Sequence, residues 1–170
     1  INRQRRLTQG AQIQELTATD LQDLEPNLAP IFPHAVLYPN GFTILDPKQM
    51  TSRMVDHLCH TGGHFIKGEV SAVEAHSADS VAFKVNGNRH HYDQAVLAGG
   101  AWSMQIAKDG CEKLPLDTER GYHVLFSESA ELLNRPVGFA DAGFYMTPMY
   151  QGLRAAGTVE LGGLNAAPNP

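Results

Sequence analysis

Four side chains in the last third of this 170-residue sequence could together hold a small anion. They are two arginines and two tyrosines: Arg120, Tyr122, Tyr145 and Arg154. A guanidinium is a planar, permanently charged fork that matches a carboxylate, and a phenolic hydroxyl can complete the hydrogen bonding around it. These residue types therefore suit the positioning of an amino acid.

Each of the four has a structural alternative. An arginine on a strand is often solvated or paired with a nearby carboxylate, here Glu119 or Glu160, and a tyrosine on a sheet often packs against its neighbours. His123 should point to the face opposite Arg120 and Tyr122 if that strand is regular, so we give it no part in the same group. We assign no catalytic acid or base.

A second set of candidates is a glycine pair that follows a short apolar run. Residues 94–98 predict a strand buried on both faces, Gly99 and Gly100 end it, and Trp102 lies in the helix start that follows. Because glycine has no side chain, the main chain here lets a nucleotide approach closely. The alternative is a tight turn that needs positive φ.

Three histidines, His57, His60 and His64, surround Cys59 and raise the question of a zinc site. The glycine pair at 62–63 should end the helix before His64, and no second ligand pair follows at structural-zinc spacing. We therefore predict no metal site.

Two helices are marked by their capping residues. Thr17 and Asp20 form a capping pair for a short helix that must end at Pro26. Asp46 caps a longer amphipathic helix over 47–61, in which proline takes the first position and a glycine pair supplies the left-handed stop.

From residue 65 the apolar period changes to two, which indicates strands. The dipeptides Asn86-Gly87 and Gln151-Gly152 predict hairpin turns, residues 30–45 predict extended chain rich in turns, and 128–133 predicts a short helix. The fold class is therefore α/β (α+β), a mixed, largely antiparallel sheet with a few helices. The predicted strands are 65–67, 70–75, 81–85, 89–92, 120–126, 137–140, 144–150 and 153–159.

Composition excludes several classes of protein. A net charge of −5 without a basic stripe argues against a nucleic-acid surface, and no apolar run is long enough to span a membrane. The first residues lack the apolar core of a signal peptide, and Cys59 and Cys111 fall on separate elements, which favours reduced thiols and a cytoplasmic location.

The order of four motifs resembles the D-amino-acid oxidase superfamily of FAD-dependent amine oxidoreductases. The motifs are a strand followed by Gly-Gly-Ala-Trp at 99–102, Leu-Pro-Leu at 114–116, Arg-Gly-Tyr at 120–122 and Gly-Thr-Val-Glu at 157–160. The likeness is greatest to D-amino-acid dehydrogenases and to glycine or sarcosine oxidases. Met149 is a departure, because relatives of the glycine oxidase type carry an arginine after the matching proline.

The resemblance implies FAD as cofactor and assigns roles to the candidates above. Substrate would be bound in a part formed by 1–45 and 112–165, and flavin would face a part formed by 46–111. The implied substrate-binding residues are Arg120, Tyr122, Tyr145 and Arg154, and the implied cofactor-binding residues are Val70, whose main chain would meet adenine, Gly99, Gly100 and Trp102, which would pack beneath the flavin.

The implied activity is oxidation of a D-amino acid to its imino acid and then keto acid, by hydride transfer to flavin. A glycine- or sarcosine-type amine oxidase that uses dioxygen is one alternative, and a non-catalytic ligand-binding domain of the same architecture is another. The implied partners are the amino-acid substrate and the rest of a parent chain. The resemblance leaves open whether that parent contacts the inner membrane peripherally.

The resembled proteins should open with a Gly-x-Gly-x-x-Gly fingerprint and close with a glycine-rich flavin segment. Neither occurs in residues 1–170, so we expect a single fragment of a longer enzyme. We expect the fragment by itself to be inactive and to bind FAD poorly or not at all.

Overall fold

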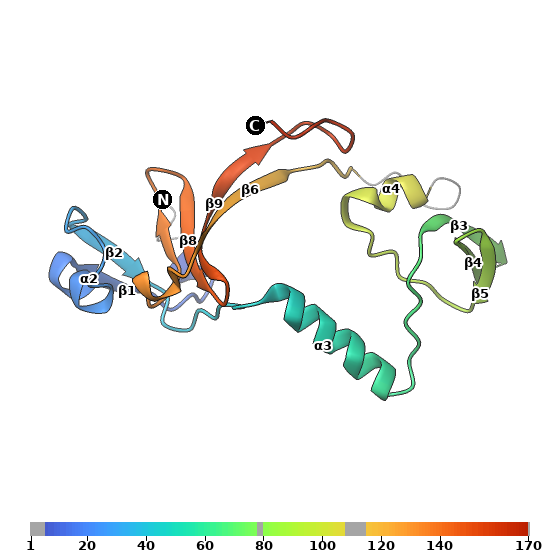
Figure 1. Cartoon of the computed structure of the whole chain (residues 1–170), viewed down its shortest axis with the longest axis horizontal. Helices are drawn as coiled ribbons and strands as arrows, with labels where there is room; N and C mark the ends of the chain where they lie inside the picture. The colour runs from blue at the N-terminus through green and yellow to red at the C-terminus, as the bar shows by residue number, and fades with distance from the viewer. Residues whose placement is uncertain (1–5, 78–79, 108–114, 170) are drawn as a thin grey trace. The chain divides into compact units, whose positions relative to one another are not determined.

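A computed structural model describes residues 6–77, 80–107 and 115–169 (Figure 1). Within them, short helices alternate with antiparallel strands, which confirms the predicted fold class. In chain order the elements are β1 (Gln14–Thr17), α2 (Ala18–Leu24), β2 (His34–Leu37), α3 (Pro47–His60), β3 (Val70–Ser77), β4 (Ser80–Val85), β5 (Asn88–Tyr92), η1 (Gly100–Trp102), α4 (Ser103–Ile106), β6 (Arg120–Ser127), η2 (Ala130–Leu132), β7 (Val137–Phe139), β8 (Phe144–Met149) and β9 (Gly152–Glu160).

Helix α2 begins with the predicted capping box. The Thr17 hydroxyl accepts from the Asp20 N–H at 3.2 Å, and the Asp20 carboxylate accepts from the Thr17 N–H at 2.9 Å. Two amides that the first turn cannot satisfy by itself are thereby paired. The helix ends at Leu24, with Glu25 as its C-cap just before Pro26.

Helix α3 also begins and ends as its sequence predicts. The Asp46 carboxylate accepts from the Gln49 N–H at 2.9 Å. At the other end Gly62 has φ of +94°, and the Gly63 N–H reaches back to the Leu58 carbonyl at 2.9 Å. This reversal satisfies a carbonyl of the last turn and stops the helix.

Strands β3, β4 and β5 form a three-stranded antiparallel sheet in that order. Its second turn is the predicted two-residue hairpin, since Asn86 and Gly87 have φ of +49° and +83°. Positive φ at both central residues is the type I′ geometry whose twist matches the flanking strands.

The larger sheet has the order β6-β9-β8-β7. Its β8–β9 hairpin turns at Tyr150 and Gln151, because Gly152 already pairs with Met149. The predicted turn is therefore displaced by one residue. The predicted helix over 128–133 is shorter than expected, a single 3-10 turn at η2.

Two strands in the amino-terminal segment were not predicted. β1 and β2 form an antiparallel hairpin-like pair around α2, and Leu16 of β1 is only 5% exposed. Both strands are four residues long, too short for an alternating pattern to stand out from turn-rich surroundings.

Two predicted strands are wrong. Residues 65–67 and 94–98 have no regular secondary structure and pair with no strand among the described residues, and Val96 is 90% exposed. An apolar run becomes a buried strand only when neighbours hydrogen-bond its edges and other layers cover its faces. Local hydrophobicity alone could not supply those neighbours.

The chain divides into two units, and each contains two separate stretches of sequence. The first unit holds 1–54 and 121–158, and the second holds 55–120 and 159–170. The assignment of a substrate-binding part and a flavin-facing part to stretches of this chain stays a prediction.

Glu25 anchors the first unit across a long stretch of sequence. Its carboxylate is 1% exposed and accepts hydrogen bonds from the Asn134 N–H at 2.8 Å and from Arg135 Nε at 2.7 Å. A buried charge is stable only when it is paired and hydrogen-bonded. These contacts fix the end of α2 against the segment that leads into β7.

No helix in the described part of the chain is both long and apolar enough to cross a membrane.

Candidate functional site

The second unit contains a pocket of about 650 Å³ beside the start of β3. It brings together two of the predicted cofactor-binding residues, Val70 and Trp102. Helix α4 lies against β3 here, so the pocket lies where strand and helix meet. Its lining residues are Glu69, Val70, Ser71, Trp102, Gln105 and Ile106.

The main chain at the start of β3 is open on one side. β3 lies at the edge of its sheet, and the register shifts between Val70 and Ala72, a bulge at Ser71. Edge strands and bulges leave main-chain N–H and C=O groups without ladder partners. A flat heterocycle in this pocket could therefore pair with peptide groups of β3.

A hydrogen-bonded turn holds this strand start in place. The Asn86 side chain accepts from the Glu69 N–H at 2.9 Å, and the Asn86 N–H donates to the Glu69 carbonyl at 3.0 Å. Both peptide groups of Glu69 are thus tied to the β4–β5 turn.

The predicted glycine pair lies on the turn that leads to Trp102. Gly100 has φ of +54°, and a Cβ built on it would meet no atom within 4 Å. A Cβ on Gly99 would instead lie 3.3 Å from Ser103 Oγ. The structure therefore shows the left-handed turn and, at Gly100, main chain with open space beside it.

Trp102 lines the pocket and is 59% exposed. The described residues leave much of its indole uncovered. The predicted packing beneath a flavin stays a prediction, but the exposed ring could make such a contact.

Arg120 is engaged by a carboxylate of its own unit. Its Nη1 lies 3.1 Å from Glu160 Oε2, and its Nη2 donates to the Ala166 carbonyl at 2.6 Å. Both side chains are about a quarter exposed, at 27% and 26%. Arg120 therefore pairs with a nearby carboxylate, as arginines on strands often do. A substrate carboxylate at Arg120 would have to compete with Glu160.

Tyr145 and Arg154 lie on one face of the larger sheet. In the β8–β9 register, Tyr145 is opposite Ala156 and Thr147 is opposite Arg154. Residues two apart on a strand share a face, so Tyr145 and Arg154 are diagonal neighbours, with Cα atoms about 7–8 Å apart. A small molecule could contact both side chains.

The Arg154 guanidinium has an unusual environment for a surface strand. Its Nε is buried and has no hydrogen-bond partner among the described residues. Leaving a buried charged donor unpaired is costly, so an acceptor that reached this nitrogen would gain from pairing with it. A carboxylate is the acceptor that best matches a guanidinium.

Tyr122 lies on β6, the strand next to β9. It is half-buried, whereas Gly121 and His123 on either side are exposed. Because Tyr122 and His123 are consecutive residues of β6, we expect their side chains on opposite faces.

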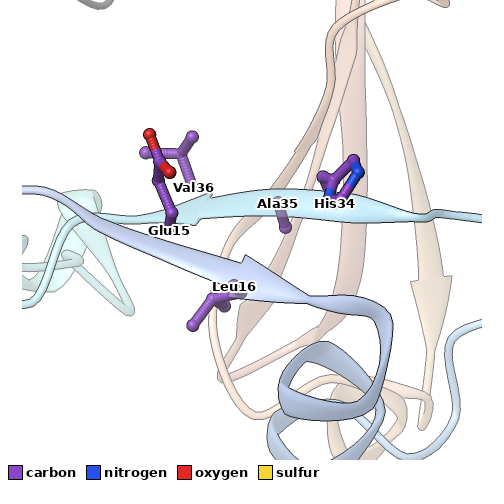
Figure 2. A pocket seen from close by; sticks show the side chains of 5 residues that line it. All are labelled: Glu15, Leu16, His34, Ala35 and Val36. Atoms are coloured by element: carbon purple, nitrogen blue, oxygen red, sulfur yellow. The ribbon is translucent and has the colours of Figure 1, made fainter.

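Sequence reasoning missed a smaller pocket of about 400 Å³ on the β1–β2 pair (Figure 2). Glu15, His34 and Val36 project from one side of the two strands, and Leu16 and Ala35 from the other. No pattern in the sequence pointed to this pocket, because both strands are too short for an alternating pattern to stand out.

The family model described as "DAO: FAD dependent oxidoreductase" matches residues 1–170. The chain belongs to this family. The match confirms the resemblance on which the cofactor and substrate assignments depend.

Known members and structures agree with the family. A D-amino-acid oxidase of Bradyrhizobium diazoefficiens is 32% identical over 155 residues, which are 91% of this chain and 37% of that protein. The glycine oxidase from Geobacillus kaustophilus matches 94% of this chain and 43% of its own, with 19% identity and a TM-score of 0.72. The glycine oxidase from Bacillus cereus ATCC 14579 matches 98% of this chain and 46% of its own, with 20% identity and a TM-score of 0.75. This member of the family thus spans less than half the length of these relatives.

The second-unit residues fit part of the cofactor that the family uses. The pocket offers edge main chain at Val70 and Ser71 and an exposed indole at Trp102, and the turn before it has uncovered main chain at Gly100. Peptide groups suit the polar edge of an adenine ring, and an aromatic face suits stacking. A role for these residues in holding FAD stays a prediction.

Other predicted site residues lie outside this pocket. Arg120, Gly99 and Gly100 are not among the residues that line it. Leu114 and Cys111 lie outside the described residues, and Cys59 is exposed and free.

Proposed function

We propose that this chain is part of an FAD-dependent enzyme that oxidises a D-amino acid to its imino acid, which hydrolyses to a keto acid. The family match over the whole chain supports the flavin chemistry, and the relative named D-amino-acid oxidase supports the substrate class. The observation that carries the proposal is the pairing of a phenol and a guanidinium on one face of the larger sheet, at Tyr145 and Arg154.

Bound FAD would supply the chemistry, since it accepts the hydride from the carbon that bears the amine. The residues of this chain would position the substrate. The Arg154 guanidinium would bind the carboxylate, and the Tyr145 hydroxyl would donate to the same group. Arg120 and Tyr122 are further candidates, with Arg120 in competition with Glu160.

A glycine- or sarcosine-type oxidase that uses dioxygen is the second candidate. The two glycine oxidase structures support the shared fold. Met149 argues against this candidate, because it follows Pro148 where relatives of that type carry arginine. We place a non-catalytic ligand-binding domain third.

The electron acceptor separates a dehydrogenase from an oxidase. We propose that the full-length parent is a D-amino-acid dehydrogenase of the cytoplasm. Peripheral contact of the parent with the inner membrane is compatible with this proposal. We further propose that the rest of the parent chain completes the flavin site.

The test is turnover by the full-length parent with a panel of D-amino acids, their L-isomers, glycine and sarcosine, each with a dye acceptor and with dioxygen. We expect turnover of D-isomers, faster with the dye. Turnover of glycine and sarcosine alone would favour the second candidate. Reaction of L-isomers alone would overturn the proposal, and so would binding of an amino acid without turnover by the flavin-loaded parent.

A further inference from the structure

Three neighbouring strands place three residues in a row on the face that carries Tyr145. Gly138 of β7 is directly opposite Tyr145 of β8, and Ala156 of β9 is opposite Tyr145 on its other side. Directly opposed residues share a face of an antiparallel sheet. The row therefore reads glycine, tyrosine, alanine.

The Tyr145 ring occupies the space that a side chain at position 138 would fill. A Cβ built on Gly138 would lie 2.6 Å from Tyr145 Cε1, 3.0 Å from Cδ1 and 3.2 Å from Cζ. Three ring atoms at these separations mean that the ring lies over the main chain of β7.

Backbone geometry does not explain the glycine. Gly138 is absent from the positive-φ residues, so a side chain would cause no strain in its backbone. Its neighbours Val137 and Phe139 have side chains on the same short strand. What excludes a side chain at 138 is the ring of Tyr145.

The Tyr145 ring contacts the main chain of β7 but is still exposed to solvent. One side of it rests on β7, yet Tyr145 is 62% exposed. The ring contacts the main chain of β7, and on the other side of β8 Arg154 lies two residues from Ala156 on the same face. The position of the Tyr145 hydroxyl relative to Arg154 thus depends on the absence of a side chain at 138.

We propose that Gly138 is a positioning residue for substrate binding: its missing side chain seats the Tyr145 ring so that the Tyr145 hydroxyl and the Arg154 guanidinium meet one substrate carboxylate. This inference rests on the proposed function of Tyr145 and Arg154. The competing explanation is structural, because an aromatic ring can protect the exposed main chain of a glycine in an edge strand.

The test uses the flavin-loaded full-length parent and its best D-amino acid. Gly138→Ala should fold, since the exposed ring can swing away, and it should raise KM roughly tenfold with a smaller change in kcat. Tyr145→Ala should raise KM at least as much. In the double variant Gly138→Ala/Tyr145→Ala, KM should match that of Tyr145→Ala, because no ring remains to be displaced.

Gly157→Ala is the matched control on the opposite face, where the new Cβ would lie 2.5 Å from Phe144 Cβ and 2.6 Å from the Gly143 carbonyl oxygen. It should lower Tm more than Gly138→Ala does and raise KM less, because it adds no atom against the Tyr145 ring. If Gly138→Ala lowers Tm but not KM while Tyr145→Ala raises KM, the inference is wrong and the proposed function stands. If Tyr145→Ala itself leaves KM unchanged, both the inference and the role of Tyr145 fail, and this result stands even if Gly138→Ala does not fold.

Discussion

The Arg154 side chain combines a permanent charge with a buried Nε that lacks a partner among the described residues. Arg120, by contrast, already has the Glu160 carboxylate at 3.1 Å. Sequence alone could not separate these two arginines, because each lies on an apolar strand near a glutamate. The structure separates them by what each guanidinium already contacts.

Arg154→Lys in the parent enzyme tests this difference. Lysine keeps the charge but loses the planar fork, so KM for the amino acid should rise about tenfold or more, equivalent to about 1.4 kcal/mol per factor of ten. Steady-state kinetics measure the change. Arg89→Lys is the control, because Arg89 pairs with Glu74 in an exposed ion pair, and KM should stay unchanged. A larger effect from Arg120→Lys would reverse the assignment.

The capping pair predicts a pH dependence for α2. The hydrogen bond from the Thr17 hydroxyl, aided by the Thr17 N–H, lowers the pKa of Asp20 below its ordinary value. A group with a lowered folded pKa stabilises the fold fully above its unfolded pKa and loses this contribution as pH falls through the folded pKa. The protection of α2 amides, measured against the intrinsic exchange rate at each pH, should therefore fall only in that acidic range.

Carboxyl NMR titration of the chain checks the cause. In Thr17→Val the hydroxyl is lost, so the pKa of Asp20 should rise toward its ordinary value. Thr19→Val removes a hydroxyl that takes no part in the cap and should leave the pKa of Asp20 where it is. An equal rise in both variants would contradict the assignment.

At the scale of elements, the predictions that succeeded depend on local chemistry. Helix α3 and the β4–β5 hairpin are specified by a few adjacent residues: Asp46, Gly62 and the Asn86-Gly87 pair. The strands predicted at 65–67 and 94–98 are wrong, because an apolar run does not show whether another strand will pair with it. β1 and β2 were missed because each is short and finds its partner across α2.

The same limits apply to the candidate site. Val70 and Trp102 were expected from the family resemblance, and they do line one pocket. The bulge at Ser71 and the hydrogen bonds of Asn86 to Glu69 could not be read from the sequence, because both depend on register across the sheet. Gly138 carried no signal at all until its strand partner was known.

Asn86→Ala should loosen the start of β3. The variant loses the acceptor for the Glu69 N–H and puts alanine at φ of +49°, which together should cost about 1 to 2 kcal/mol of unfolding free energy. Denaturant unfolding measures the loss, and amide exchange should be fastest at Glu69. Asn86→Asp keeps the acceptor and tolerates the left-handed backbone, so it should lose much less. Equal losses would show that the side-chain bond is unimportant.

At the scale of the whole molecule, the described residues form a pocket that could take part of FAD, but the sequence has no Gly-x-Gly-x-x-Gly motif. The pyrophosphate would therefore have no helix-start cradle of that kind in these residues. The family relationship covers all 170 residues, but only 37% of the length of the D-amino-acid oxidase relative.

The purified 170-residue chain should accordingly carry no stoichiometric flavin and show no yellow colour. Visible absorption after incubation with FAD and gel filtration measures this directly. The flavin-loaded parent, handled identically, is the positive control. Flavin retained at one equivalent per chain would overturn the expectation. It would show that these 170 residues make enough contacts to hold the flavin by themselves.

The division of the sequence between the two units has a consequence for synthesis. The chain passes from one unit to the other after residues 54, 120 and 158, and Glu25 finds its partners 109 and 110 positions later. On a ribosome, α2 would emerge well before the Asn134 amide and the Arg135 guanidinium that donate to the carboxylate at its end. Long-range closure of this kind slows folding, so we expect Glu25 to stay solvated until residues 134 and 135 have been translated.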